Sequence, residues 1–139
     1  MIEVQNVHSK TQLNQVFDIR REVFVKEQMV DENEEYDEFE FLSSHLLAYL
    51  DKIPVGTCRY RNTQKGIKLE RFAVLKDYRK YKVGEALVRR VLRVVDLNQH
   101  IYLHAQVQVV DFYQKYGFEV AGNIFEEANI QHYKMIYRK

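Results

Sequence analysis

One segment near the middle of the chain holds most of the information on fold and function. It reads Leu69-Glu70-Arg71-Phe72-Ala73-Val74-Leu75-Lys76-Asp77-Tyr78-Arg79-Lys80-Tyr81-Lys82-Val83-Gly84-Glu85-Ala86-Leu87. The pattern predicts a strand, then a basic loop, then the first turn of a helix. Backbone N–H groups at a helix N-terminus lack partners within the helix and carry a partial positive charge. Because anions bind readily at such ends, the segment suits a pyrophosphate or other polyphosphate ligand.

Basic side chains continue from this loop into the expected helix. Residues 76–93 carry seven cations against two acids, Asp77 and Glu85. The cations are Lys76, Arg79, Lys80, Lys82, Arg89, Arg90 and Arg93. A polyphosphate would be attracted to this surface. A plain strand–helix connection with a solvated basic face explains the composition equally well, because one glycine at a helix start is a weak signal.

The flanking sequence alternates between strand and helix patterns. A capping box at residues 9–12 predicts a helix over about residues 11–25, and an apolar stripe predicts another from residue 83. Apolar residues from Val109 to Tyr116 predict a third helix, which Gly117 ends. The expected strands begin at Ile2 and then cover residues 45–50, 54–61, 68–75, 101–105, 118–121 and 132–137. This order predicts an α/β fold, a mixed sheet with helices on its faces.

Composition limits the classes of protein that need to be considered. The 139 residues suit a single domain, 1–139, and 46% hydrophobic residues are enough to form a core. A net charge of +1 gives no reason to expect nucleic acid as a partner. The lone Cys58 has no internal disulfide partner, and we expect it to fill the core. With no signal peptide or membrane span recognisable, a cytoplasmic location and no membrane partner are expected.

Several motifs, in order, resemble the GNAT superfamily of acetyltransferases. Arg79-x-x-Lys82-x-Gly84 is similar to that family's pyrophosphate loop, Gln/Arg-x-x-Gly-x-Gly/Ala, and residues 112–118 resemble its Phe-Tyr-x-x-x-Gly-Phe signature. Residues 21–28 and 127–132 resemble two patterns of the small, stand-alone ElaA-like branch. One departure is Lys82, which replaces the first glycine of the loop. If the backbone there needs a positive φ, lysine has a conformational cost that its ammonium could offset by reaching a phosphate.

The resemblance implies a central mixed β-sheet of six to seven strands flanked by about four helices. It also implies acetyl-CoA as co-substrate, in a cleft where two neighbouring strands separate. Pantetheine would pair with main-chain groups of Phe72 and Val74, and pyrophosphate with N–H groups from about Lys80 to Gly84. The implied cofactor-binding residues are Phe72, Ala73, Val74, Arg79, Lys80, Tyr81, Lys82, Val83, Gly84 and Gln106.

The resemblance also suggests roles in catalysis. An N–H group near Phe72 would stabilise the oxyanion, although it could be an ordinary sheet donor. Tyr113 matches the general acid that protonates the leaving thiolate, although it could simply pack in the core. Glu70 is the first candidate for general base, because in a regular strand it would share a face with Phe72. It could equally be a surface carboxylate paired with Arg71 or Lys68. The histidine candidates are His132 and His104.

The acceptor is left open among several classes. Glu27, Gln28 and His132 are the expected substrate-binding residues, and no metal site is expected. A small-molecule amine is the first expectation, as an amino acid, polyamine or amino sugar. A protein lysine or N-terminus, or a non-catalytic acetyl-CoA sensor, are the alternatives. The acidic run at residues 31–40 carries seven carboxylates; it would attract cationic amines or merely solvate a loop or short helix facing water. A monomer or a homodimer is expected.

Overall fold

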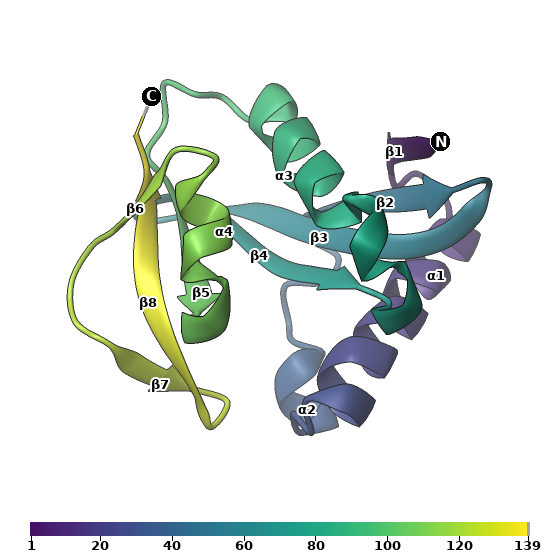
Figure 1. Cartoon of the computed structure of the whole chain (residues 1–139), viewed down its shortest axis with the longest axis horizontal. Coiled ribbons are helices and arrows are strands. Elements are labelled where there is room, and N and C mark those ends of the chain that lie inside the picture. Colours follow the sequence, from purple (N-terminus) through teal and green to yellow (C-terminus); the bar gives the residue numbers. More distant parts are fainter. Residues whose placement is uncertain (139) are drawn as a thin grey trace.

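The computed structural model describes residues 1–138 and is built on one twisted mixed sheet (Figure 1). Its strands are β1 (Ile2–Asn6), β2 (Ser44–Leu50), β3 (Ile53–Thr63), β4 (Gly66–Val74), β5 (Ile101–Gln106), β6 (Phe118–Val120), β7 (Phe125–Glu127) and β8 (Ile130–Tyr137). They lie in the order β1-β2-β3-β4-β5-β8-β6, and β7 also pairs with β8. The α/β mixed-sheet prediction is confirmed, with eight strands where six to seven were expected.

Helices cover both faces of this sheet. They are α1 (Lys10–Arg20), the π-helical segment η1 (Arg21–Glu27), α2 (Glu32–Glu35), the 3₁₀ segments η2 (Lys76–Tyr81) and η3 (Val107–Val109), α3 (Val83–Val94) and α4 (Val110–Gln114). The predicted capping box begins α1: the Gln12 N–H donates to Ser9 Oγ at 3.1 Å, and Gln12 Oε1 accepts from the His8 N–H at 2.8 Å. Within residues 1–138, no helix has the length and apolar character needed to cross a membrane.

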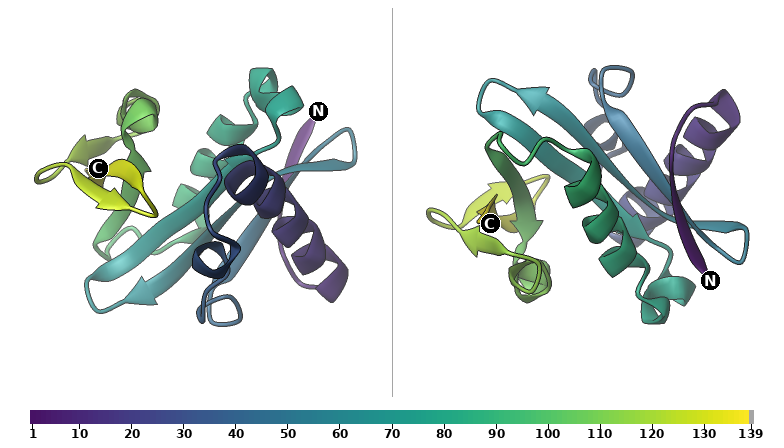
Figure 2. Two further views of the ribbon diagram at one scale, coloured as in Figure 1. Left: turned by 90° about the horizontal axis from the view of Figure 1, so that it is seen from below. Right: turned by 90° about the horizontal axis from the view of Figure 1, so that it is seen from above.

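The core lies in two parts, one on each face of the sheet. Helices α3 and α4 pack on one face, and α1 with η1 packs on the other (Figure 2). Gly56 on β3 lets α3 approach closely, since a Cβ there would lie 2.7 Å from Val83 Cγ1. Cys58, also on β3, is fully buried in the α3 part of the core, as the sequence predicted.

The two parallel strands at the centre of the sheet separate along their length. β4 and β5 pair only at Ile67–Ile101, Lys68–Tyr102 and Leu69–Leu103. Beyond Leu69 the two strands diverge, as Figure 1 shows. The edge of β4 that faces β5 therefore has no strand partner from Glu70 to Val74.

A bulge in β4 redirects the side chains at this point. Arg71 has a φ of +58°, and the pairing of β3 with β4 shifts register opposite it. Because a bulge inserts an extra residue, the alternation of faces is broken. Phe72 packs in the core beneath α3, whereas Glu70 forms ion pairs on the α1 face. The expectation that Glu70 and Phe72 share a face is therefore wrong.

Candidate active site

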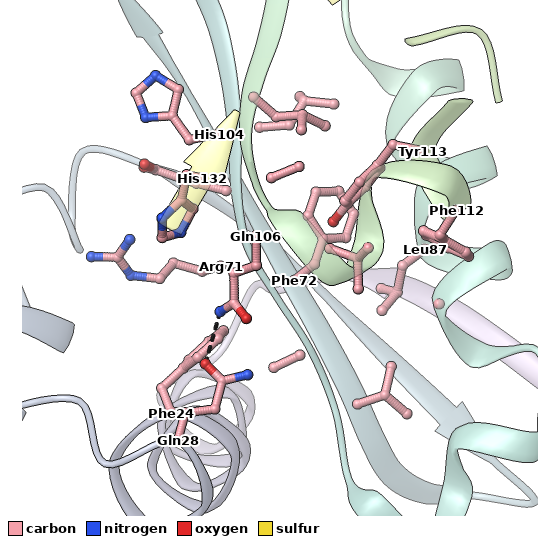
Figure 3. Close-up of a pocket in the computed structure, with 18 of the residues that line it drawn as sticks. Phe24, Gln28, Arg71, Phe72, Leu87, His104, Gln106, Phe112, Tyr113 and His132 are labelled. Carbon is pink, nitrogen blue, oxygen red and sulfur yellow. Dashed lines mark hydrogen bonds between the residues drawn. The ribbon is translucent and has the colours of Figure 1, made fainter. Parts of the chain in front are cut away.

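A cleft of about 770 Å³ opens where β4 and β5 separate (Figure 3). Its walls come from β4, β5, α4 and β8, and one end reaches the loop between η2 and α3. Eight of the ten expected cofactor residues line it: Phe72, Ala73, Val74, Arg79, Lys80, Lys82, Gly84 and Gln106. The other two do not: Val83, the first residue of α3, is buried in the core, and Tyr81 is 55% exposed.

The loop end of the cleft is suited to an anion. Lys82, immediately before α3, has φ +63° and ψ +30° and provides no side-chain cap to the helix. The first-turn N–H groups of α3 thus remain available to an anion, beside the ammonium groups of Lys80 and Lys82. Left-handed backbone costs a residue with a Cβ about 1–2 kcal/mol. Lys82 therefore occupies a left-handed backbone position that favours glycine, as the resemblance to the pyrophosphate loop led us to consider.

Arg79 is held in place by two neighbouring segments. Its Nη1 and Nη2 donate to the two carboxylate oxygens of Glu27 at 2.7 and 2.6 Å, and its Nε donates to the Val74 carbonyl oxygen at 2.9 Å. The Arg79 side chain lowers the pKa of Glu27 below its ordinary value. Glu27 does not line the main cleft. It was expected to bind substrate, but its carboxylate instead positions the loop that carries Arg79.

Tyr113 occupies the wall formed by α4. The residue is 7% exposed, and its ring makes edge contacts with Phe72 and Phe118 at 5.6 and 5.9 Å between ring centroids. Its hydroxyl points toward Phe72 within the cleft (Figure 3). Burial raises the pKa of Tyr113, so the hydroxyl stays protonated and can donate a hydrogen bond. Tyr113 therefore packs in the core and also faces the cleft.

Two buried arginines organise the acidic run on the α1 face. Arg20 donates to Glu35 at 2.6 Å and to Glu40 at 2.7 and 2.8 Å. Arg59 donates to Asp37 at 2.9 Å and to Glu40 at 3.0 Å. Glu35 and Glu40 are only 4% and 5% exposed. The prediction that this run faces water is therefore wrong for these two residues, because each is buried against arginine.

Glu70 belongs to the same network. Its carboxylate accepts from Arg59 Nε at 2.8 Å and Arg61 Nε at 2.7 Å, and it lies 3.4 Å from Lys68 Nζ. Burial acts to raise the pKa of Glu70, but these cations more than offset it, and the pKa lies below its ordinary value. Glu70 lines the cleft, yet it is a weaker base than a free carboxylate. The sequence reasoning did not foresee this network. The available signal was the presence of Arg20 and Arg59 among residues expected to be buried.

His132 on β8 lines the cleft and is 7% exposed. Its Nδ1 lies 2.7 Å from the Ile130 carbonyl oxygen. Because a carbonyl can only accept, Nδ1 carries the proton in the neutral ring, and Nε2 keeps its lone pair. The other candidate, His104, instead pairs through Nδ1 with Glu127 at 3.2 Å. Between the two, His132 is the better placed to accept a proton in the cleft.

Two glutamines join the end of η1 to β5. Gln106 Nε2 donates to Gln28 Oε1 at 2.8 Å, drawn as the dashed line in Figure 3. Gln108 Nε2 in turn donates to Gln106 Oε1 at 2.6 Å. Gln28 and Gln106 both line the cleft, as expected of substrate-binding and cofactor-binding residues. Each amide is oriented by its neighbour, so this wall is built of fixed polar groups.

The fold and the cleft define an α/β protein with a cleft between two separating strands, one end of which meets the N-terminus of a helix. Residues 4–139 match the family model described as "Acetyltransferase (GNAT) domain". The uncharacterized N-acetyltransferase YjcF of Bacillus subtilis is 38% identical over 92% of this chain and 94% of its own length. The crystal structure of Escherichia coli ElaA superposes with a TM-score of 0.88 and 27% identity, covering 99% of this chain and 100% of that one.

A third comparison involves a bound coenzyme. The PaiA N-acetyltransferase from Thermoplasma acidophilum, solved in complex with coenzyme A, shares the fold with a TM-score of 0.73 at 17% identity. That match covers 100% of this chain and 99% of the other. Given the family model and the identity to YjcF, this chain belongs to the GNAT acetyltransferase family. It is therefore an N-acetyltransferase, and acetyl-CoA is the co-substrate that this family membership implies.

Proposed function

We propose that the protein transfers the acetyl group of acetyl-CoA directly to the primary amine of a small molecule, in a ternary complex. The observation that carries this proposal is the single cleft that runs from the basic loop at α3 to the polar wall of β8. Its volume of about 770 Å³ is within the range of small-molecule sites. Both reactants can therefore meet in one cavity without a covalent enzyme intermediate.

The donor end fits coenzyme A through groups of this chain. Lys80, Lys82 and the first-turn N–H groups of α3 would hold the pyrophosphate. The unpaired edge of β4 leaves main-chain groups of Phe72 and Val74 free for the pantetheine. When bound, acetyl-CoA supplies the acetyl group as an activated thioester. An N–H group near Phe72 on this edge would stabilise negative charge on the carbonyl oxygen.

Tyr113 is the proposed general acid. Its hydroxyl lies in the cleft beside Phe72, and its raised pKa keeps it protonated before transfer. The hydroxyl would donate its hydrogen to the sulfur of the leaving thiolate. A low-dielectric wall of aromatic rings strengthens such a hydrogen bond, because little water competes for it.

His132 is the proposed general base, in place of Glu70. A protonated amine must lose a proton before its nitrogen can attack, and Nε2 of the neutral His132 ring can accept that proton directly or through water. Glu70 is bound by Arg59 and Arg61, so proton uptake there would weaken two ion pairs. The hydrogen bond from Nδ1 to Ile130 fixes both the tautomer and the orientation of the His132 ring.

The test is release of coenzyme A from acetyl-CoA across a panel of small primary amines, with a lysine-containing peptide included. Turnover of at least one small amine, faster than of the peptide, is the expected result. Binding of acetyl-CoA without turnover of any acceptor would favour a non-catalytic sensor. Turnover of the peptide alone would replace the small acceptor by a protein acceptor.

A further inference from the structure

We propose that the acceptor carries a carboxylate beside its amine, as amino acids do, and that Arg71 binds this carboxylate. The inference rests on the proposed function and names the substrate class of the same cleft. Arg71 stands between Glu70 and Phe72 on β4 and lines the cleft. In Figure 3, its side chain extends along the same wall as Gln106 and His132, opposite Tyr113.

The contacts of Arg71 are long compared with those of its neighbours. Its nitrogens lie 3.2 Å from Glu35 Oε1, 3.3 Å from Asp37 Oδ2, and 3.3–3.4 Å from the carbonyl oxygens of Glu34 and Glu35. Charge-assisted bonds are usually about 2.7–2.9 Å long, and those of Arg20 fall at 2.6–2.8 Å. All of these contacts are made by Nε and Nη2 of Arg71, and within residues 1–138 its Nη1 makes no hydrogen bond or ion pair. Part of the guanidinium fork is therefore available to a ligand.

Ion pairs join five cations and four carboxylates in this partly buried network. Its cations are Arg20, Arg59, Arg61, Lys68 and Arg71, and its carboxylates are Glu35, Asp37, Glu40 and Glu70. A positive charge without a full partner is costly where water is scarce. Lys68 and Arg71 are the two members whose ion pairs are all 3.2 Å or longer, and Arg71, which carries the planar fork, has a side chain that is 20% exposed. An anion entering the cleft can reach it.

A carboxylate matches this vacancy better than other groups do. It brings one negative charge, the number that a single guanidinium neutralises, whereas a phosphate monoester brings about 1.5–2. Its two oxygens also match the planar fork of arginine. A polyamine would add positive charge beside Arg71, and an amino sugar would leave that charge unneutralised. Three further carboxylates, Glu34, Glu85 and Glu127, line the cleft; Glu85 pairs with Arg89 and Glu127 pairs with His104.

The backbone supports this role for Arg71. A residue with a Cβ and a φ near +58° is strained and stays there only because the surrounding structure holds it, and such strain is common at functional sites. Here the bulge turns Arg71 and Glu70 toward the α1 face while Phe72 remains beside Tyr113. The same irregularity therefore places an anion-binding side chain near the point of acetyl transfer.

The first experiment compares each amino acid with its primary amide and with its decarboxylated amine, by release of coenzyme A. We expect kcat/KM at least tenfold higher for some amino acids than for both partners. The amide has the less basic amine, which is more often neutral, so this comparison is biased against the proposal. Equal or faster turnover of the amides and amines would overturn it.

Variants then assign the preference to Arg71. Arg71→Gln should reduce the ratio of acid to amide turnover to about one, and Arg71→Lys should retain part of it. Arg61→Gln is the matched control, since it removes a cation of the same network whose Nε is already 2.7 Å from Glu70. A ratio that survives Arg71→Gln, or collapses equally in Arg61→Gln, contradicts the role of Arg71.

Product binding separates this proposal from the proposed function. Calorimetry with the native protein and coenzyme A should detect N-acetyl amino acids and show at least tenfold weaker binding of their amides. This measurement needs neither turnover nor a folded Arg71 variant. Binding of the acids without turnover of any amine would refute catalysis but support the anion site. Turnover of other amines without binding of the acids would refute the anion site alone.

Discussion

Nη1 and Nη2 of Arg79 lie 2.7 and 2.6 Å from the two carboxylate oxygens of Glu27, across 52 positions of sequence. This bidentate pair links the end of η1 to the loop before α3. The Arg79 Nε bond to the Val74 carbonyl ties the same loop to the end of β4. The three contacts fix the loop whose backbone is proposed to hold the pyrophosphate.

Glu27→Gln should therefore raise KM for acetyl-CoA roughly threefold to tenfold, about 0.7–1.4 kcal/mol. The reason is loss of loop positioning, so kcat should change less than KM. Glu22→Gln is the control, because Glu22 pairs with Lys26 on the exposed side of the same helical segment. Steady-state kinetics with acetyl-CoA varied provide the measurement. An equal effect of both variants would show that charge alone, and not this pair, matters.

Tyr113→Phe should lower kcat at least tenfold, about 1.4 kcal/mol in the barrier, with little change in acetyl-CoA binding. Removal of the hydroxyl takes away the proposed donor to the thiolate and leaves the packing of the ring with Phe72 and Phe118. Tyr116→Phe is a matched control three residues along the chain, in the turn that follows α4. If Tyr113→Phe retains native kcat, the tyrosine is only a packing residue.

His132→Gln should lower turnover at neutral pH by tenfold or more, with partial recovery at a pH above the pKa of the acceptor amine. Recovery is expected because an amine that is already neutral needs no base. Glu70→Gln should show no such recovery. Rate–pH profiles of the two variants against the native protein make the comparison. Recovery of turnover at high pH for Glu70→Gln but not for His132→Gln would instead identify Glu70 as the general base.

Lys82 allows the backbone and charge contributions to be separated. Lys82→Gly should raise the free energy of unfolding by up to about 1 kcal/mol. Glycine adopts φ +63° without strain, and this gain should exceed the loss that comes from the greater flexibility of glycine in the unfolded chain. Lys82→Ala keeps the strain and removes the ammonium. Both variants should raise KM for acetyl-CoA if the ammonium reaches a phosphate. Denaturant unfolding and steady-state kinetics test the two effects; a less stable Lys82→Gly contradicts the first.

Arg20→Met should destabilise the fold by about 3–5 kcal/mol, because it leaves Glu35 and Glu40 buried without their main partner. The adjacent Arg21→Met is the control. Its pair with Glu32 is about half exposed, so water and salt screen it and it should contribute little to stability. Thermal and urea unfolding of the two variants should differ clearly. Similar losses would mean that the buried network contributes little.

Local patterns were enough to predict much of this molecule. The capping box at Ser9 and Gln12, the apolar stripe of α3 and the strand–loop–helix segment all depend on neighbours within a few residues. The order of the motifs was enough to predict the family, because their spacing reflects the whole chain. Most of the expected cofactor residues line the cleft for the same reason.

Other properties depend on residues that are distant in sequence. The bulge at Arg71 separated Glu70 from Phe72, although strand alternation predicts one face for both. The acidic run met Arg20 and Arg59 in the interior, although its composition suggested a solvated surface. The sequence by itself determined most of the elements, their order and the basic loop that leads into a helix N-terminus. Only the tertiary structure decided which charges neutralise one another, because electrostatic energy depends on distance and burial in space.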